Sequence, residues 1–380
     1  MTTTRSALPS ALAALRRPAG ALLRTRLVAS LTAPRGVDHY VQLLAPTWSS
    51  SQIRARIVSV DRETEDTVSL RLTPNDNWLG FQAGQHLHLS VTIDGVRHTR
   101  TFSISSAPCE GSPLRLTIRA FPGGRVSNWA LRDARVGDVV ELSAAQGQFV
   151  WRGPASTDLL FVSGGSGLTP IRSLVQQLLH DGHAGQLTCL HYARGEVLFH
   201  SELDALGRAF RNFRFVPRLR AGLTAPAAAA ARFSLDELSA VHPAWQQSEV
   251  FVCGPSSLEH SVRDAWATAA PATQLHSEHF RQVASGLAAS GADAAARYQL
   301  VFEKSRAAIS GHGAASLLEQ AEAAGLRPAY GCRMGICHTC KCRKRSGVVR
   351  NLITGQVSDA AEGSIQLCVN APLSDLTLDA

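Results

Sequence analysis

Four cysteines near the end of the chain have the spacing of an electron-transfer site. Three follow the pattern C-x4-C-x2-C and the fourth lies far downstream: Cys332, Cys337, Cys340 and Cys368. Thiolates in this arrangement hold a plant-type [2Fe–2S] cluster. Gly331 and Gly335 would let the loop curl around the small inorganic core without a side-chain clash. Because such a cluster passes single electrons, the rest of the chain is expected to supply them.

A structural zinc site is the alternative interpretation of these cysteines. Zinc sites usually pair their cysteines as two C-x2-C units, whereas here only Cys337 and Cys340 are so spaced. The spacing therefore favours iron and sulfide. Cys342 is a further cysteine nearby, and we interpret it as a bystander thiol rather than a ligand.

An earlier segment, expected to form a strand, carries residues that could bind a flavin. The guanidinium of Arg100 suits a flavin phosphate, and Phe102, on the same face of the strand, could lie against the isoalloxazine ring. Ser103 could hydrogen-bond near the reactive N5 atom of that ring. The glycine turn at residues 123–128 opens an expected helix, whose backbone N–H groups could hold a phosphate. An ordinary amphipathic strand and a plain turn are the alternatives.

A second glycine-rich turn has the features of a dinucleotide site. Residues 161–170 run from an expected buried strand into a helix, which Thr169 should cap and which Pro170 should enter in its first turn. The glycines in this segment would let a pyrophosphate approach the helix N-terminus. The turn departs from the common G-x-G-x-x-G pattern, because Pro170 stands at the last position.

Two residues at the ends of expected parallel strands could also meet this ligand. Cys253, followed by Gly254 and Pro255, should face the crevice where such folds bind ligands. A small buried hydrophobic side chain is the alternative for Cys253. Arg194 could meet the 2′-phosphate of NADPH, with a solvated surface arginine as the alternative.

Two residue patterns in the sequence predict the strands and helices that position these residues. Short alternating strands separated by turns predict an antiparallel barrel up to about residue 142. From about residue 158, buried strands alternate with helices, which is typical of a parallel α/β domain. Strands are expected at residues 53–60, 67–72, 86–91, 100–105, 114–119, 138–142, 159–162, 187–192, 213–216 and 249–252, and helices at 171–180, 258–267 and 315–324.

Length and composition indicate several globular domains. A chain of 380 residues suits two or three domains, and no run of residues is long and apolar enough to span a bilayer. The other cysteines are scattered, which fits a reducing compartment, so we expect a cytoplasmic protein. The arginines are dispersed and no basic stripe with interleaved aromatics is present, which argues against nucleic-acid binding.

The N-terminal segment is rich in arginine and has no acidic residue before Asp38. A helix in this segment would carry an apolar stripe of Leu12, Leu15, Leu22, Leu23 and Leu27. We interpret the segment as a helical extension that packs on the flavin domain. Peripheral contact with the inner face of a membrane and an organelle transit peptide are the alternatives.

Together and in this order, these pieces resemble the ferredoxin–NADP reductase superfamily fused to a C-terminal plant-type ferredoxin. The resemblance runs from about residue 52 to the end of the chain. It implies that Ser103 and Cys253 act in catalysis, with Cys253 beside the nicotinamide. The residues that it assigns to the flavin are Arg100, Phe102, Ser103, Gly124, Val126 and Ser127, and those assigned to the dinucleotide are Gly165, Gly167 and Pro170, to which we add Thr169, Arg194, Gly254 and Pro255.

Two positions depart from the family pattern. Phe102 replaces the commoner tyrosine, so no phenol is available to hydrogen-bond the flavin. His86 stands where an aromatic residue is usual. Relatives that use FMN share the strand motif, so FAD is the favoured cofactor and FMN the alternative.

The resemblance implies a multidomain protein. We expect an antiparallel β-barrel that binds flavin at residues 51–153, a parallel-sheet α/β domain that binds NAD(P) at 154–283, and a β-grasp [2Fe–2S] ferredoxin domain at 297–380. A basic helical extension at 1–50 precedes them. The Ala/Gly/Ser-rich linker at 284–296 would let the ferredoxin domain move.

The implied activity is a three-centre electron relay. NADPH or NADH would reduce the flavin with two electrons, and the cluster would pass them singly to an oxygen-activating iron enzyme. The segment at 39–64 looks like the reductase partners of bacterial fatty-acid (acyl-CoA) desaturases, with reductases of Rieske or diiron hydroxylases as the near alternative. A reductase for a haem or hybrid-cluster partner would share these motifs, and a redox-sensing module without turnover is the alternative of another class.

The surroundings of the cluster are basic. The residues concerned are Arg333, His338, Lys341, Arg343, Lys344 and Arg345. They could form a docking surface for an acidic partner, with a solvated face as the alternative.

Overall fold

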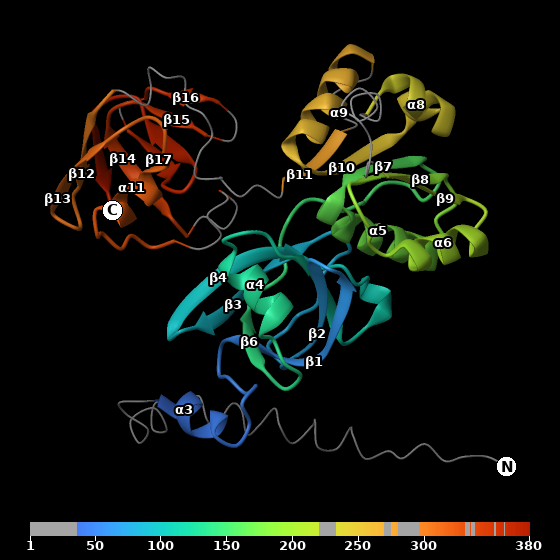
Figure 1. Ribbon diagram of the computed structural model, residues 1–380, viewed down its shortest axis with the longest axis horizontal. Helices are drawn as coiled ribbons and strands as arrows, with labels where there is room; N and C mark the ends of the chain where they lie inside the picture. Colours follow the sequence, from blue (N-terminus) through green and yellow to red (C-terminus); the bar gives the residue numbers. More distant parts are fainter. Residues whose placement is uncertain are drawn as a thin grey trace.

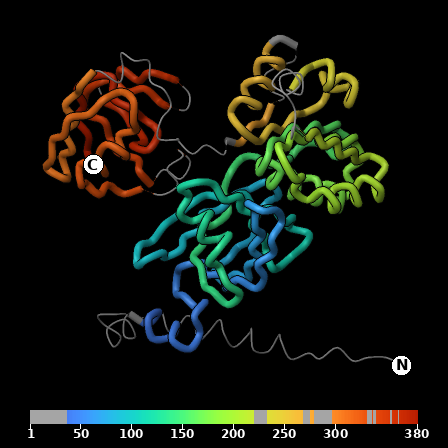
Figure 2. Tube along the Cα trace, in the orientation of Figure 1, coloured from blue at the N-terminus to red at the C-terminus, as the bar shows by residue number. Residues whose placement is uncertain are grey.

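Three bodies follow one another along the chain; the first two are each built around one sheet and the third around two (Figure 1). Figure 2 traces the chain from the first body through the second to the third. Most of the N-terminal extension, nearly all of the expected linker, Cys332 and Cys337 lie outside the described residues. The computed structural model describes residues 36–219, 233–269, 275–279, 296–330, 335, 339–352, 355–360 and 362–380.

The first body is an antiparallel barrel. Its elements are β1 (Ile53–Thr64), β2 (Thr67–Pro74), β3 (His86–Ile93), β4 (Val96–Ser103), η1 (Pro108–Glu110), β5 (Leu114–Arg119), α4 (Arg125–Arg132) and β6 (Val139–Leu142). The sheet order is β4-β3-β6-β1-β2-β5. A bridge between Ile104 and Leu116 joins the end of β4 to β5 and so connects the two edge strands. The predicted antiparallel barrel is confirmed.

Alternating side chains give the barrel an apolar inside and a polar outside. Val68, Leu70 and Leu72 of β2 are buried in the barrel core, as their alternate spacing on a strand requires. Ser69 points the other way and hydrogen-bonds Thr117 of β5 at 2.7 Å. This buried polar face meets the second body.

The second body is a parallel α/β domain, as predicted. Its elements are β7 (Leu159–Gly164), η2 (Gly165–Gly167), α5 (Leu168–His180), β8 (Leu187–Ala193), α6 (His200–Ala209), β9 (Phe213–Leu219), α8 (Leu235–Val241), η3 (Trp245–Gln247), β10 (Glu249–Gly254), α9 (Ser256–Ala269) and β11 (Leu275–His279). The strands pair in the order β11-β10-β7-β8-β9, and every pair is parallel. Residues of α5 and α6 share one apolar core with the sheet, and residues of α8 and α9 share another.

Helix α5 begins earlier than expected. Its first residue is Leu168 and its N-cap is Gly167, so the expectation that Thr169 caps the helix is wrong. The physical reason is that Thr169 already lies inside the first turn, where its Oγ1 donates to the carbonyl of Ser166 at 2.9 Å. Pro170 lies in the first turn, as expected.

The third body combines two small sheets with one short helix. Its elements are β12 (Tyr298–Phe302), β13 (Ala307–Gly311), α11 (Leu317–Ala323), β14 (Lys341–Ser346), β15 (Val349–Asn351), β16 (Val357–Ser358), β17 (Gly363–Gln366), β18 (Asn370–Pro372) and β19 (Leu376–Asp379). The sheets run β13-β12-β19-β14-β17 and β16-β15-β18. Ser316 and Glu319 form a capping box that fixes the start of α11.

The described part of the N-terminal extension is α3 (Gly36–Gln42) and the loop after it. Asp38 of this helix accepts a hydrogen bond from Ser49 Oγ at 2.6 Å. The side chain of Asn75, in the loop after β2, donates to the carbonyl of Thr47 at 2.9 Å and so ties the extension to the barrel. None of the helices in the described ranges is both long and apolar enough to cross a membrane.

Candidate flavin, nucleotide and cluster sites

The residues that the sequence assigned to a flavin line one cavity of about 400 Å³. Strand β4 contributes Arg100, Phe102 and Ser103, and α4 contributes Val126 and Ser127. Two segments that lie apart in the sequence are therefore brought to one site. The predicted roles of the individual residues stay predictions.

The start of α4 fits a phosphate group. Gly124 is the N-cap and offers no side chain to the first N–H groups of the helix. Ser127 Oγ is buried and has no hydrogen-bond partner within the described ranges. A Cβ on Gly124 would lie 2.3 Å from that oxygen and 2.6 Å from the ring of Phe121, so glycine is needed here. Donors at a helix N-terminus that lines a cavity suit a flavin diphosphate.

The turn between β7 and α5 reaches the same cavity. Ser166 and Thr169 of the second body complete its lining, opposite the groups of the barrel. A ligand in the cavity would therefore touch both bodies. This is the contact that a flavin needs in order to meet a nucleotide bound to the second body.

The structure explains why this turn contains glycines, which the sequence alone did not. A Cβ on Gly167 would lie 2.1 Å from the carbonyl oxygen of Cys253. A Cβ on Gly164 would lie 2.8 Å from the ring of Pro255, and one on Gly254 would lie 2.9 Å from the nitrogen of Gly164. The two turns thus touch backbone to backbone. Gly165 adopts a positive φ of 56°, which favours glycine.

The parallel register places polar residues in one row at the carboxyl ends of the strands. Cys253 of β10 lies between Ser163 of β7 and Glu278 of β11, and Ser163 lies beside His191 of β8. The Ser163 hydroxyl and His191 Nδ1 are 2.8 Å apart. Open parallel sheets bind their ligands at this edge.

Burial keeps two members of this row uncharged. Burial, reinforced by the carboxylates of Glu278 and Glu259, raises the pKa of Cys253 well above its ordinary value. Burial lowers the pKa of His191 to about 4. At neutral pH Cys253 is therefore a thiol, and it is fully buried rather than part of the cavity lining. This fits a small group behind the nicotinamide better than a nucleophile.

Glu278 is not among the residues that the sequence pattern indicated. Its strand β11 was not expected, and it meets the barrel across a large sequence separation. Ser103 Oγ donates to Glu278 Oε2 at 3.3 Å, and His86 Nδ1 lies 2.7 Å from Glu278 Oε1. The sequence signal that could have indicated Glu278 is an acidic residue in the segment that follows Cys253-Gly254-Pro255 along the chain.

Arg194 is exposed and follows β8 directly. It does not line the flavin cavity. Its position beyond the carboxyl end of the strand is where the ribose end of a dinucleotide is bound in such folds. Its role with a 2′-phosphate stays a prediction.

Two buried arginines join the barrel to the second body. Arg172 of α5 bonds Glu110 at 3.0 Å and Glu202 at 2.6 Å, and Arg115 of β5 bonds Glu202 at 2.8 Å. Both guanidinium groups lie over the ring of Phe199, at 4.7 Å for Arg115 and 5.4 Å for Arg172. Burial opposes ionisation of Glu110 and Glu202, but the arginines outweigh it and hold the pKa of each carboxyl below its ordinary value.

Two of the four predicted cluster ligands can be placed. Cys340 and Cys368 are buried, and their sulfurs lie 3.2 Å apart without a disulfide. Gly335 of the ligand loop has a φ of 75°, and its carbonyl accepts from the Gln366 side chain at 2.7 Å. Adjacent thiols near a glycine with a positive φ fit an iron–sulfur cluster. Cys332 and Cys337 lie outside the described residues.

The basic surface expected around the cluster is smaller than the sequence suggested. Lys344 is fully buried, and its ammonium group donates to the carbonyls of Gly347 and Ala360. It cannot therefore belong to a docking face. Arg343 pairs with Glu362, so part of the remaining charge is neutralised within the domain.

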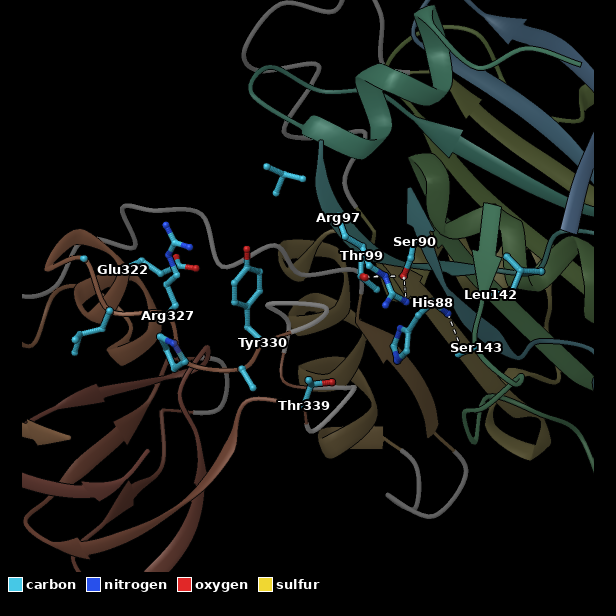
Figure 3. A pocket seen from close by; sticks show the side chains of 15 residues that line it. His88, Ser90, Arg97, Thr99, Leu142, Ser143, Glu322, Arg327, Tyr330 and Thr339 are labelled. Carbon is cyan, nitrogen blue, oxygen red and sulfur yellow. Dashed lines mark hydrogen bonds between the residues drawn. The ribbon is translucent and has the colours of Figure 1, made fainter. Parts of the chain in front are cut away.

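A larger cavity of about 980 Å³ separates the barrel from the third body. Figure 3 shows Tyr330 and Thr339 on one wall and His88, Arg97 and Thr99 on the other. This cavity lies between β3 and β4 of the barrel and the segment that leads into the predicted cluster loop.

Comparison with protein families matches three successive parts of the chain. Residues 54–151 match the oxidoreductase FAD-binding domain, and residues 161–264 match the oxidoreductase NAD-binding domain. Residues 303–372 match the 2Fe-2S iron-sulfur cluster binding domain. The FAD-binding, NAD-binding and [2Fe–2S] domains expected from the sequence are thus shown in their expected order, and the individual site residues stay predictions.

Curated relatives cover nearly the whole chain. An NADPH oxidoreductase of Mycobacterium tuberculosis is 32% identical over 98% of this chain and 95% of its own. The glycine betaine monooxygenase reductase subunit of Pseudomonas aeruginosa is 29% identical over 88% and 96%. The ferredoxin reductase component of 3-ketosteroid-9-alpha-monooxygenase from Mycobacterium tuberculosis is 31% identical over 78% and 84%.

Solved structures show the same fold. Phthalate dioxygenase reductase, described as a modular structure for electron transfer from pyridine nucleotides to [2Fe–2S], aligns with a TM-score of 0.62 at 23% identity. The alignment covers 87% of this chain and 98% of that one. An intact type IV self-sufficient cytochrome P450 monooxygenase aligns with a TM-score of 0.60 at 20% identity, over 91% of this chain and 44% of that one.

Proposed function

Because this chain belongs to the ferredoxin–NADP reductase-type oxidoreductases with a C-terminal [2Fe–2S] domain, we propose that it carries electrons from NAD(P)H through FAD and the cluster to an oxygen-activating iron enzyme. The main support is the shared cavity, which Ser103 of the barrel and Ser166 and Thr169 of the nucleotide domain line together. Relatives that are reductase components of monooxygenases support an oxygenase as the acceptor.

When bound, FAD supplies the conversion of a two-electron donor into single-electron steps. The residues of this chain would bind and orient the FAD and the nucleotide. Arg100 and the N-terminus of α4 would hold the phosphates, and Phe102 would lie against the ring. Ser103 would reach the N5 edge, and Cys253 would back the nicotinamide.

For the donor we infer NADPH, with NADH as the alternative. A relative that matches almost the whole chain is an NADPH oxidoreductase, and Arg194 stands where a 2′-phosphate could be met. Replacing Arg194 with alanine should raise KM for NADPH about 10- to 100-fold, the value of a charge-assisted hydrogen bond. KM for NADH should change little. Equal changes for both nucleotides would contradict this role.

For the acceptor we infer a fatty-acid (acyl-CoA) desaturase, with a Rieske or diiron hydroxylase as the alternative. The support is the segment at 39–64, which resembles the desaturase reductases, together with exposed leucines in this segment and on a barrel loop. Leu44 is 92% exposed and Leu79, on a neighbouring barrel loop, is 93% exposed; Leu43 is also exposed. An acceptor that works on acyl chains would be met at a lipid surface.

The same exposed leucines support our proposal of peripheral contact with an anionic membrane. Six arginines and no acidic residue precede Gly36, and the exposed Leu43 and Leu44 follow this basic segment closely in the sequence. Vesicles with anionic lipid should bind the full chain, and serine at positions 43, 44 and 79 should weaken that binding. If uncharged vesicles bind equally, or the triple variant binds like the wild type, the membrane contact is wrong.

Anaerobic purification with added iron and sulfide tests the whole proposal. The protein should contain FAD and a [2Fe–2S] cluster, and it should reduce ferricyanide and cytochrome c with NAD(P)H. A protein that contains the cluster but binds no flavin and shows no turnover with NAD(P)H would instead be a redox-sensing module. Electron transfer would then be measured to two acceptors in separate assays: membranes that contain a desaturase, and a soluble Rieske oxygenase. The acceptor that the protein reduces distinguishes the two alternatives.

A further inference from the structure

The loop that joins β8 to α6, residues 194–199, has one exposed end and one buried end. Arg194 is exposed, whereas Leu198 and Phe199 are buried in the apolar core that α5 and α6 share with the sheet. Arg194 carries the proposed contact with the 2′-phosphate of NADPH. Because the loop is short, the position of Arg194 depends on how the buried end is held.

Phe199 has a backbone conformation that a bulky residue rarely adopts. Its φ of 54° and ψ of 22° lie in the left-handed region, where a residue with a large side chain is strained. Phe199 is the N-cap of α6, and its carbonyl accepts a helical hydrogen bond from the backbone nitrogen of Leu203 at 2.9 Å. Strain of this kind persists only where neighbouring groups enforce the conformation.

An arginine of the barrel is one of these neighbours. The guanidinium of Arg115, on β5, lies 4.7 Å from the centre of the Phe199 ring. Its Nη1 donates to the carboxylate of Glu202, in the first turn of α6, at 2.8 Å. Arg115 therefore contacts both the residue that precedes α6 and the first turn of that helix.

The barrel holds this guanidinium in one position. The side chain of Arg115 is only 5% exposed. Its Nε donates to Ser69 Oγ on β2 at 2.9 Å, and its Nη2 pairs with Glu63 on β1 at 2.5 Å. With Glu202 bound to Nη1, each nitrogen of the group has a partner. Arg115 thus ties the start of α6 to two further strands of the barrel.

We propose that Arg115 is a positioning residue for nucleotide recognition. By holding Phe199 and the first turn of α6, it fixes the loop that carries Arg194 at the edge of the parallel sheet. The barrel thereby contributes to the discrimination of NADPH from NADH, through Phe199 and Glu202 rather than through a contact with the nucleotide. The inference rests on the proposed function, because it assumes that Arg194 meets the 2′-phosphate.

Replacing Arg115 with methionine tests this role in the full-length holoprotein. The variant loses the guanidinium and keeps an unbranched apolar side chain, and Glu202 keeps Arg172 as a charge partner at 2.6 Å. With ferricyanide as acceptor, Arg115→Met should raise KM for NADPH about 2- to 30-fold, the usual effect of a residue that acts on a site through other residues. KM for NADH and kcat at saturating NADPH should change little.

A second measurement isolates the phosphate end of the nucleotide. The fragment 2′,5′-ADP contains the 2′-phosphate and no nicotinamide, so its inhibition constant reports on binding near Arg194. This constant should rise in Arg115→Met by the same factor as KM for NADPH. A residue with only a structural role would change KM for NADPH and for NADH alike.

A matched control removes another buried hydrogen bond between the barrel and the nucleotide domain. Ser173 Oγ of α5 donates to the carbonyl of Ser106 at 2.6 Å, and neither residue belongs to the 194–199 loop. Ser173→Ala should lower the unfolding temperature and leave the ratio of the two KM values unchanged. A changed ratio in this control would show that any loosening of the interface alters nucleotide choice, and would overturn the specific role of Arg115.

The outcomes distinguish this inference from the proposed function. If Arg194→Ala loses the preference for NADPH but Arg115→Met keeps it, the inference is wrong and the proposed function stands. If the wild type reduces ferricyanide without preferring NADPH, the inference fails together with the choice of nucleotide, while the electron relay stands. If the wild type oxidises neither nucleotide, the proposed function fails as well.

A second variant keeps the test decisive if Arg115→Met does not fold. Phe199→Asn removes the ring against which the guanidinium packs, and asparagine tolerates the left-handed backbone conformation. It should also raise KM for NADPH and the inhibition constant of 2′,5′-ADP, with little change in KM for NADH. Wild-type values of all three constants would overturn the inference.

Discussion

The barrel meets its two neighbouring domains in opposite ways. Against the nucleotide domain it buries charged groups, since Arg172 is 3% exposed and bonds carboxylates from both sides. Against the ferredoxin domain it borders a cavity of about 980 Å³. Figure 3 shows hydrogen bonds that run along the barrel wall of this cavity: Ser90–Thr99, Arg97–Ser90 and Ser143–His88.

The difference matches the two transfers that the protein is proposed to perform. Hydride transfer needs reacting atoms about 3–3.5 Å apart and well aligned, so a fixed interface serves it. Transfer of a single electron does not require atoms in contact. A ferredoxin domain that is held less tightly can therefore serve both the flavin and an external acceptor.

Removing Cys368, a proposed cluster ligand, should have the largest effect and should affect only electron transfer through the ferredoxin domain. Because changes around metal ligands already cost 10- to 100-fold, Cys368→Ser should lower cytochrome c reduction by more than about 100-fold. NAD(P)H-dependent ferricyanide reduction, which the flavin alone can support, should survive. Cys342→Ser is the matched control and should keep the cluster absorbance. Loss of both activities in Cys368→Ser would show that the cluster domain also supports the flavin site.

Removing the buried arginine should break the rigid interface. Arg172→Met leaves Glu110 and Glu202 without this charge partner and should lower the free energy of unfolding by about 3–5 kcal/mol. Denaturation with urea, followed by flavin release, measures this. Arg208→Ala removes an exposed pair with Asp204 and should cost less than about 0.5 kcal/mol. Similar costs for both variants would mean that burial does not strengthen the interface.

Acid should weaken the same interface. The pKa values of Glu110 and Glu202 lie below the ordinary 4.5 in the folded protein, so their ionised forms stabilise it. This contribution is complete above about pH 4.5 and is lost as the pH falls through the lower folded values. Glu110→Gln should therefore flatten the decline of unfolding free energy with falling pH. An identical pH profile would argue against the ion pairs.

A change at the cavity beside the ferredoxin domain should have a small effect. The side chain of Arg97 is 59% exposed and pairs with Glu141 at 2.5 Å. Because exposed ion pairs contribute about 0–1 kcal/mol, Arg97→Ala should change stability by no more than that. Thermal unfolding of the variant beside Arg172→Met checks the contrast. A loss as large as that of Arg172→Met would mean that the cavity closes in solution.

Local patterns in the sequence predicted much of this molecule. The cysteine spacing, the alternation of strands such as β2 and the strand–turn–helix around Gly167 each depend on residues close in the chain. These patterns identified the barrel, the parallel sheet and most of the flavin cavity. The N-cap of α5 was predicted at the wrong residue because the Thr169 hydroxyl also finds a hydrogen-bond partner from within the first turn of the helix.

Contacts between segments that lie far apart in the sequence could not be predicted in the same way. His86 and Glu278 lie 192 positions apart, and only the folded pair of domains brings them together. Arg172 meets Glu110 across the same interface, with no local pattern to announce it. Lys344 looked like part of a solvated basic run, yet neighbouring backbone carbonyls fill the role of water around its ammonium group.

The burial of Cys253 also bears on how the enzyme withstands oxidants. Reduced flavins leak electrons to oxygen and so produce peroxide close to the nicotinamide site. Peroxide attacks thiolates far faster than thiols. Because Cys253 is fully buried and its pKa is raised, it should resist sulfenic acid formation and alkylation by iodoacetamide, and damage should begin elsewhere.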